Sequence, residues 1–203
     1  MAEDRDLGLF MLDMVLLPGE SAGLHLFEPR YRQLYADCVL GDLPFVLVRG
    51  DDADRARVGC TARFVALHRR HEDGRLDVTV RGEDPVEVFD PTDGRLYRSA
   101  RTRVLAAADE PAVGELAGSV LERYRALAGA EATPPELTDV PLSYALAGTL
   151  RVDTSVKQAL LEERSERARL ALLGELLEGA EHASRRAEVA AQRAPTNGKV
   201  DHR

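Results

Sequence analysis

The sequence of 203 residues contains no tryptophan and only two cysteines, and aromatic residues make up 5% of it. Aromatic side chains provide the stacking platforms of many proteins that bind single-stranded nucleic acid, so their scarcity argues against that class. Two cysteines, Cys38 and Cys60, cannot form a disulfide framework, and isolated thiols suit a reducing cytoplasm. Whether the two thiols lie close together is left open by their spacing.

Long apolar runs are also missing. No segment approaches the roughly 20 apolar residues that a membrane helix needs. The polar, acidic start, residues 1–6, is unlike a signal peptide, and we therefore expect a cytoplasmic protein. A formal charge of -8 and a pI of about 5.2 argue against a general phosphate-backbone binder, which needs a basic face. Lysine occurs only at Lys157 and Lys199, a bias typical of a GC-rich bacterial genome.

The hydrophobic pattern changes period along the chain and predicts an α+β fold. The first half contains short apolar or alternating runs, which are typical of strands, at 7–12, 15–17, 45–48, 58–67, 76–80, 86–89 and 96–105. The second half has apolar residues three and four apart, which are typical of helices, at 113–127, 142–150, 156–161 and 165–180. These patterns predict a small, closed or nearly closed β-barrel over 1–110, a helical bundle over 111–184 and a disordered tail over 185–203.

One helix is expected inside the barrel region, over residues 29–40. Pro29 suits a first helical position, where its missing N–H costs nothing, and Glu28 places a carboxylate near the positive end of the helix. The apolar face of this helix would comprise Tyr31, Leu34, Tyr35 and Cys38. Gly41 is a plausible end of the helix.

The chain resembles the amino-terminal, substrate-binding domain of the Lon protease family over roughly residues 7–180. The resembling segments are 9–10, 15–19, 25–31, 58–59, 142–145 and 156–162, with Pro18, Gly19, His25, Phe27, Glu28, Pro29, Arg30 and Tyr31 as the signature. We expect these signature residues to be mainly structural. The resemblance implies a PUA-like barrel, a class that includes RNA binders.

The family pattern has an arginine followed by an aromatic residue after the strand that ends near Val80, and this pair is missing from residues 81–86. Pro85 in the same segment predicts that the next strand begins later or lies at a sheet edge.

The sequence contains no motif for ATP hydrolysis or peptide hydrolysis. A P-loop and a Gly-x-Ser-x-Gly elbow are both missing. Ser155 and Lys157 are the residue types of a Ser-Lys peptidase, but they stand at the wrong point of the family architecture. We interpret them as a helix N-cap and a surface lysine. We therefore expect a stand-alone, non-enzymatic protein with no cofactor.

The histidines and cysteines offer few combinations that could hold a metal or act in catalysis. His25 and Glu28 are too few for zinc, which takes three or four protein ligands. His68 and His71 stand beside Glu72 and Asp73, where a hairpin turn is expected to be polar anyway. Cys38 and Cys60 fit small buried apolar residues better than nucleophiles. We therefore predict no metal site and no catalytic residue.

The leading hypothesis is a binding module for polypeptide segments, or an adaptor in protein quality control, with a protease or chaperone as partner. Phe27, Tyr31 and Tyr35 are candidate peptide-binding residues, and packing in the core is the alternative for each. The leucine-rich last helix could form a dimer seam.

Two other classes stay open. The first is an RNA-binding module that uses arginines near the hairpin and the last strand, namely Arg63, Arg69, Arg70, Arg75, Arg95, Arg98, Arg101 and Arg103. We regard nucleic acid as a poor fit, because acidic residues are interspersed among these arginines. The second is a hydrolase with an unrecognised site, which would need convergent titratable groups in a concave surface.

Overall fold

A computed structural model describes residues 4–50, 58–92, 95–109, 113–128 and 140–193. The chain divides into two compact units, each made of two segments. The first unit comprises residues 1–110 and 135–166, and the second comprises residues 111–134 and 167–203. The first unit holds all the described strands, and the second is helical.

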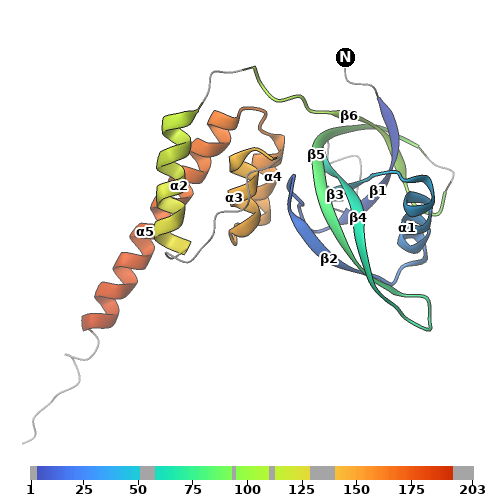
Figure 1. The fold of residues 1–203 in the computed structure, drawn as a ribbon, viewed down its shortest axis with the longest axis horizontal. Coiled ribbons are helices and arrows are strands. Elements are labelled where there is room, and N and C mark those ends of the chain that lie inside the picture. The colour runs from blue at the N-terminus through green and yellow to red at the C-terminus, as the bar shows by residue number, and fades with distance from the viewer. Residues whose placement is uncertain (1–3, 51–57, 93–94, 110–112, 129–139, 194–203) are drawn as a thin grey trace, which may run out of the picture. The chain divides into compact units, whose positions relative to one another are not determined.

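Six strands of the first unit form one sheet in the order β2-β5-β4-β3-β1-β6 (Figure 1). They are β1 (Arg5–Leu12), β2 (Ser21–Leu26), β3 (Phe45–Arg49), β4 (Val58–Arg70), β5 (Leu76–Thr92) and β6 (Ser99–Val104). The pairs are antiparallel except for β1 and β3, which are parallel. Because β5 also pairs with β6, the pairings of β1, β3, β4, β5 and β6 run in a ring, and β2 is added to it through β5.

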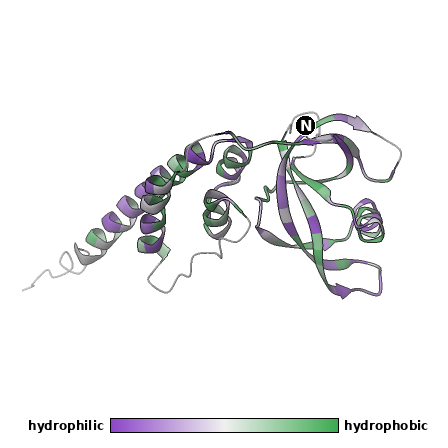
Figure 2. Cartoon of the chain, turned by 45° about the horizontal axis from the view of Figure 1, so that its top comes forward, coloured by the Kyte–Doolittle hydropathy of each residue, from purple (hydrophilic) through white to green (hydrophobic). Residues whose placement is uncertain are grey.

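The core lies inside this ring of strands. It includes a cluster formed by Leu7, Leu9, Val46, Val48, Val86, Val88 and Ala100, each at most 6% exposed. The predicted run at 45–48 forms β3 and is buried throughout, as expected for a strand without a solvent face. In β5, buried and less buried residues alternate along Leu76–Val80, in agreement with the alternating sequence pattern. Figure 2 shows this mixture of apolar and polar residues along the strands.

Two strand predictions were wrong. Residues 15–17 are deeply buried but lie in an extended loop, because their neighbours Pro18 and Gly19 attach to another part of the sheet. Pro85 does not end or delay a strand, since β5 runs unbroken from Leu76 to Thr92. Proline is tolerated here because the β4–β5 register shifts beside its partner Cys60, and its carbonyl still accepts a hydrogen bond from the Leu105 N–H (2.9 Å).

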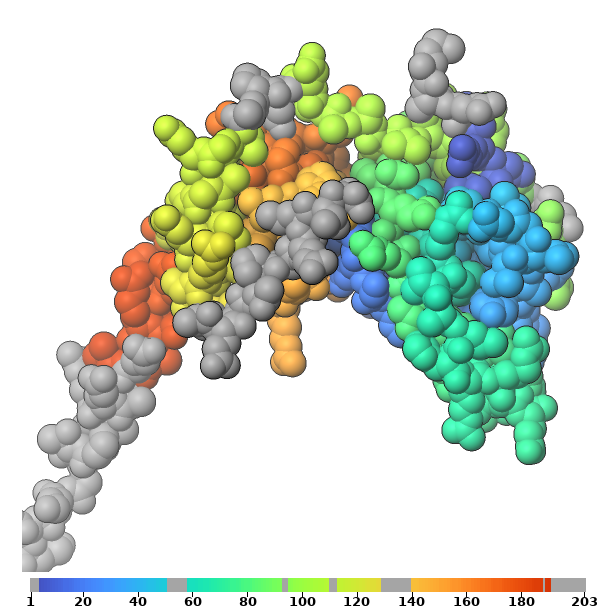
Figure 3. Space-filling view, viewed as in Figure 1, coloured from blue at the N-terminus to red at the C-terminus, as the bar shows by residue number. Residues whose placement is uncertain are grey.

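The predicted hairpin between β4 and β5 is confirmed. Its end projects from the other strands, as Figure 3 shows for the blue-green segment. The turn is closed by a bond from the His71 N–H to the Arg75 carbonyl (2.9 Å), and Gly74 has the positive φ of 84° that glycine accepts easily.

The helix expected over 29–40 is confirmed as α1 (Pro29–Gly41). Pro29 takes a first-turn position and Glu28 is the N-cap residue, but the Glu28 side chain makes no capping bond. Instead it accepts a hydrogen bond from Arg30 Nε (2.9 Å). The helix ends at Gly41, although the residue in the left-handed region is Asp42, with φ of 48°. Tyr31, Leu34 and Cys38 form the buried face.

Four helices follow the strands, as the sequence predicted, and two short ones among them are grouped with the strands in the first unit. These two are α3 (Leu142–Thr149) and α4 (Thr154–Glu162). Backbone and side-chain bonds attach the end of α4 to the segment after β6: the Ala108 N–H donates to the Arg164 carbonyl (3.0 Å), and Arg164 Nε donates to the Ala106 carbonyl (2.7 Å). The start of α3 is fixed by Glu166, which accepts bonds from the Ser143 N–H and hydroxyl.

The second unit consists of α2 (Gly114–Ala128) and most of α5 (Glu166–Arg193). Their apolar stripes agree with the sequence prediction, and the buried apolar residues are Val120, Tyr124, Leu170, Leu173 and Leu177. The guanidinium of Arg123 lies 3.6 Å from Glu178 and 3.7 Å from Glu181 on α5. Helix α5 continues to Arg193, beyond residue 184 where the disordered tail was predicted to begin; residues 194–203 lie outside the described part.

Candidate functional site

The signature residues Pro18 and Gly19 attach the loop before β2 to β5. Pro18 forms a bridge with Gly82, and the Gly19 N–H donates to the Gly82 carbonyl (2.9 Å). Gly82 in turn donates to the Glu20 carbonyl (2.9 Å). A Cβ at Gly82 would lie 2.3 Å from the Leu17 carbonyl oxygen, so only glycine allows this close approach of two backbones. Pro18 and Gly19 thus attach this loop closely to β5.

Lys157 is not the surface residue that we predicted. Its ammonium group pairs with the carboxylate of Glu20, and the two side chains are only 16% and 14% exposed. Glu20 also accepts a bond from the Leu17 N–H (3.1 Å). The pair thus joins α4 to the loop before β2, which contains Pro18 and Gly19 and is called the signature loop below. Asp153, not Ser155, is the N-cap residue of α4.

Within the segment 25–31, the side chains have separate environments. Tyr31 is buried, its ring stacks on Phe10 at 4.0 Å between centroids, and its hydroxyl donates to the Met11 carbonyl (2.9 Å). Phe27 is 61% exposed. Tyr35, which lies on the next turn of α1, is half-buried against the edge of Phe64. Of the three candidate peptide-binding residues, Phe27 is the one with a large exposed apolar surface.

His25 is brought to His71 and Asp77, a grouping that sequence spacing did not predict. His25 pairs with Asp77 across the antiparallel strands β2 and β5, and His71 follows the end of β4. Asp77 lies 2.5 Å from His25 Nδ1 and 2.8 Å from His71 Nε2. The hydrogen bond from His25, and to a smaller extent the one from His71, hold the pKa of the Asp77 carboxyl below its usual value. His68 instead bonds Thr79 (2.7 Å), and Asp73 bonds Arg75.

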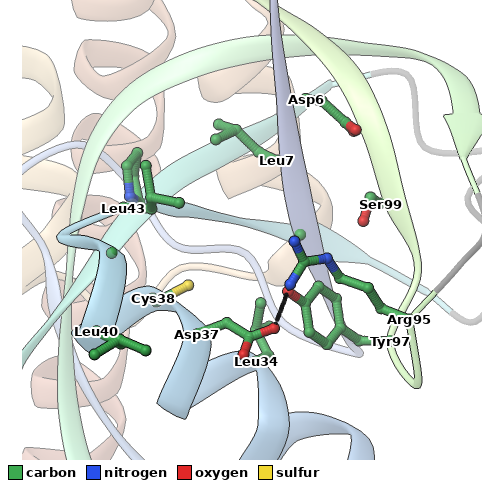
Figure 4. A pocket seen from close by; sticks show the side chains of 13 residues that line it. Asp6, Leu7, Leu34, Asp37, Cys38, Leu40, Leu43, Arg95, Tyr97 and Ser99 are labelled. Atoms are coloured by element: carbon green, nitrogen blue, oxygen red, sulfur yellow. Dashed lines mark hydrogen bonds and ion pairs between the residues drawn. The ribbon is translucent and has the colours of Figure 1, made fainter.

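A pocket of about 270 Å³ lies beside the C-terminal half of α1 (Figure 4). Strand β1, helix α1 with the residues that follow it, and the segment 95–99 supply its walls. The lining residues are Asp6, Leu7, Gly8, Leu34, Asp37, Cys38, Leu40, Gly41, Leu43, Pro44, Arg95, Tyr97 and Ser99. Gly8 allows Leu34 and the Tyr97 ring to approach β1 closely, because a Cβ at Gly8 would lie 2.4 Å from Leu34 and 2.8 Å from the Tyr97 ring.

One carboxylate organises the polar side of this pocket. Asp37 Oδ2 accepts hydrogen bonds from the Tyr97 hydroxyl (2.7 Å) and from Arg95 Nη1 (2.5 Å). A dashed line at Asp37 in Figure 4 marks this interaction. Burial, together with the bond to Asp37, raises the pKa of Tyr97 to about 12. Burial and the nearby Asp37 charge raise the pKa of the Cys38 thiol to about 11. A raised pKa disfavours the thiolate, which is the nucleophilic form of cysteine.

Exposed apolar side chains stand at the same end of α1. Leu40 is 91% exposed and Leu43 is 55% exposed, and both line the pocket. Val39, next to Leu40, is 56% exposed. The helical pattern predicted only the buried face of α1 and therefore did not include these residues. Residues 39 and 40 are apolar although they lie off that face, and this feature of the sequence could have indicated an exposed apolar surface.

The arginines considered for RNA binding are largely engaged by carboxylates. Arg63 pairs with Asp42 and Glu83, and Arg75 pairs with Asp73. Arg101 and Arg103 both pair with Asp4. A basic stripe that attracts phosphates needs uncompensated positive charge, which these pairs reduce.

Similarity to known proteins agrees with the motifs. The model of the ATP-dependent protease La (LON) substrate-binding domain matches residues 6–179, and the chain belongs to this family. Among solved structures, the fold is similar to a Lon N-terminal domain protein from Xanthomonas campestris, with 25% identity, a TM-score of 0.66, and coverage of 83% of this chain and 96% of that one. It is also similar to the N-terminal domain of the Mycobacterium avium complex Lon protease, with 18% identity, a TM-score of 0.65, and coverage of 86% and 98%.

No curated protein sequence matches the chain. Among the described helices, none has the length and apolar character needed to cross a membrane.

Proposed function

We propose that this protein binds polypeptide segments, without catalysing a reaction, by inserting an apolar side chain of the segment into the pocket beside α1. The observation that supports this most directly is the combination of a pocket with strongly exposed leucines at its entrance, Leu40 and Leu43. Binding sites are more frequent at exposed apolar surfaces of this kind than elsewhere on a protein surface. Family membership supports the same class of ligand, since the matching domain is a substrate-binding domain.

The polar side of the pocket would form hydrogen bonds with the bound polypeptide. The guanidinium of Arg95 has five N–H donors, and its side chain is 55% exposed. It can donate to a backbone carbonyl of the bound segment while Asp37 holds it in place. Apolar insertion would give affinity, and the bond from Arg95 would orient the chain. In this proposal the ring of strands is the PUA-like barrel, and the protein acts as an adaptor in cytoplasmic protein quality control.

Binding of an unfolded model protein tests this proposal. Fluorescently labelled, reduced and carboxymethylated α-lactalbumin would be titrated with the full chain and followed by anisotropy. Leu40→Asp should weaken binding at least about fivefold, equivalent to about 1 kcal/mol, because a charge replaces an apolar contact. Leu40 is almost fully exposed, so this substitution should leave folding intact.

Val189→Asp is the matched control, since Val189 is also an exposed apolar helix residue, 45% exposed on α5. Phe27→Ser tests the alternative placement near the start of α1. A loss of binding with Phe27→Ser but not with Leu40→Asp would move the site to Phe27. No binding by the wild-type chain would reject polypeptide recognition itself.

A further inference from the structure

We propose that His25, His71 and Asp77 form a binding site for a divalent transition-metal ion of the Zn²⁺ class. The three side chains each offer one ligand atom, and these atoms all lie within 4.8 Å of one another. Two imidazoles and one carboxylate are the donors of many three-ligand zinc sites, in which water fills the fourth position. The proposal is independent of polypeptide binding.

The strands position the three ligands without any long loop. His25 and Asp77 are direct partners in the β2–β5 ladder, and they lie on the face opposite the buried Leu26, Leu76 and Val78. His71 stands at the first turn position after β4, where its own N–H bonds to the Arg75 carbonyl. The backbone of all three residues is thus fixed by the sheet and its hairpin turn, which lowers the cost of assembling a site.

The distances between the three ligand side chains are close to those of a metal site. With metal–ligand bonds of about 2.1 Å, tetrahedral ligand atoms lie about 3.4 Å apart. Asp77 is already at 2.5 Å from His25 Nδ1 and at 2.8 Å from His71 Nε2. The imidazole rings are 5.5 Å apart and nearly perpendicular, at 82°, so both can turn a nitrogen toward one point. Rotations of the two rings and of the Asp77 carboxylate would bring the ligand atoms from within 4.8 Å of one another to this spacing.

The charge of the group also suits a cation. Asp77 is an anionic ligand whose proton affinity is already lowered by its two histidine partners. The competing thiols are unsuitable, because Cys38 and Cys60 are buried and burial raises the pKa of each. Imidazole and carboxylate ligands favour Zn²⁺ over Ca²⁺ or Mg²⁺, which prefer oxygen ligands.

Isothermal titration of the untagged full chain with ZnCl₂ tests the site. We expect one Zn²⁺ per chain, and a loss of affinity of at least about tenfold for each of His25→Ala, His71→Ala and Asp77→Asn, since even outer-sphere partners of a metal are worth about 10–100-fold. Binding to the folded state alone should also raise the Tm of the wild-type chain, and His25→Ala should abolish this increase.

His182→Ala is the matched control, because His182 also lies near a carboxylate, 3.8 Å from Glu178 on α5, but belongs to no group of three possible metal ligands among the described residues. Circular dichroism without metal would check that each variant folds. If His71→Ala does not fold, His25→Gln at the most exposed ligand replaces it. Co²⁺ bound in place of Zn²⁺ should give the intense visible absorption of a four-coordinate ion. An absence of Zn²⁺ binding, or binding that all three substitutions leave unchanged, would overturn the proposal.

Discussion

At the scale of single residues, Glu20 has an unusual number of structural roles. Its N–H donates to the Leu17 carbonyl (3.0 Å), its carbonyl accepts from Gly82, and its side chain binds both the Leu17 N–H and Lys157. One residue therefore closes the signature loop, attaches that loop to β5 and pairs with α4. The alternative assignment of Lys157 to peptidase chemistry has no support in this geometry, because its ammonium group is occupied by a carboxylate.

The Glu20–Lys157 pair should stabilise the fold measurably. Lys157→Met leaves a mostly buried carboxylate without its cation, and we expect the free energy of unfolding to fall by about 3 kcal/mol. The double variant with Glu20→Gln should lose clearly less than the sum of the single variants, because the unpaired charge is then removed as well. Urea unfolding of the four proteins in this cycle provides the measurement.

Arg185→Met is the control for that cycle. Its pair with Glu181 on α5 is i,i+4 and the arginine is 64% exposed, so its removal should change stability by less than about 0.5 kcal/mol. Strict additivity of the Glu20 and Lys157 substitutions would show that the pair is not coupled.

At the scale of elements, β5 is the strand on which the first unit depends. It pairs with β2, β4 and β6, and its middle also receives the Pro18–Gly19 loop. Local pattern predicted the hairpin, α1 and α2 correctly, because alternation and helical spacing reflect a single buried face. It could not predict that β5 passes through Pro85, since that depends on partners distant in sequence. The pocket at α1 was missed for the same reason, because its walls come from three separated segments.

The close approach at Gly82 gives a test of this element. Gly82→Ala would place a methyl group 2.3 Å from the Leu17 carbonyl oxygen, and backbone cannot shift as easily as a side chain. We expect a loss of at least about 2 kcal/mol in the free energy of unfolding, from strain and overpacking. The midpoint of urea unfolding measures it.

Gly23→Ala is the paired control, because Gly23 also lies in a strand, β2, and an added Cβ there would meet nothing within 4 Å. Its substitution should leave stability within about 0.5 kcal/mol of wild type. Equal effects at the two glycines would mean that the loop moves away from β5 at little cost.

At the scale of the whole molecule, the chain crosses between its two units instead of completing one before the next. Residues 135–166 return to the unit that contains the strands, and α2 and α5 of the other unit come from segments on either side of this return. The return segment contributes buried apolar side chains to the first unit, namely Tyr144, Leu146, Ala147, Leu160 and Leu161. Gln158 also donates to the Val58 carbonyl at the start of β4 (3.2 Å).

This arrangement predicts how fragments will behave. The fragment 1–110, which follows the boundary suggested by the hydrophobic pattern, lacks the buried residues of the return segment and the cation that pairs with Glu20. We expect it to expose apolar surface, and to aggregate or unfold without cooperativity. Residues 1–166 with a Gly-Ser linker of equal length in place of 111–134 keep the complete first unit. That fragment should give dispersed amide NMR signals and a cooperative urea transition, because no buried contact within the unit has been removed. If instead 1–110 alone folds as cooperatively as the longer fragment, then α3 and α4 are additions to a self-sufficient ring of strands, and the stabilising role assigned to Lys157 must be small.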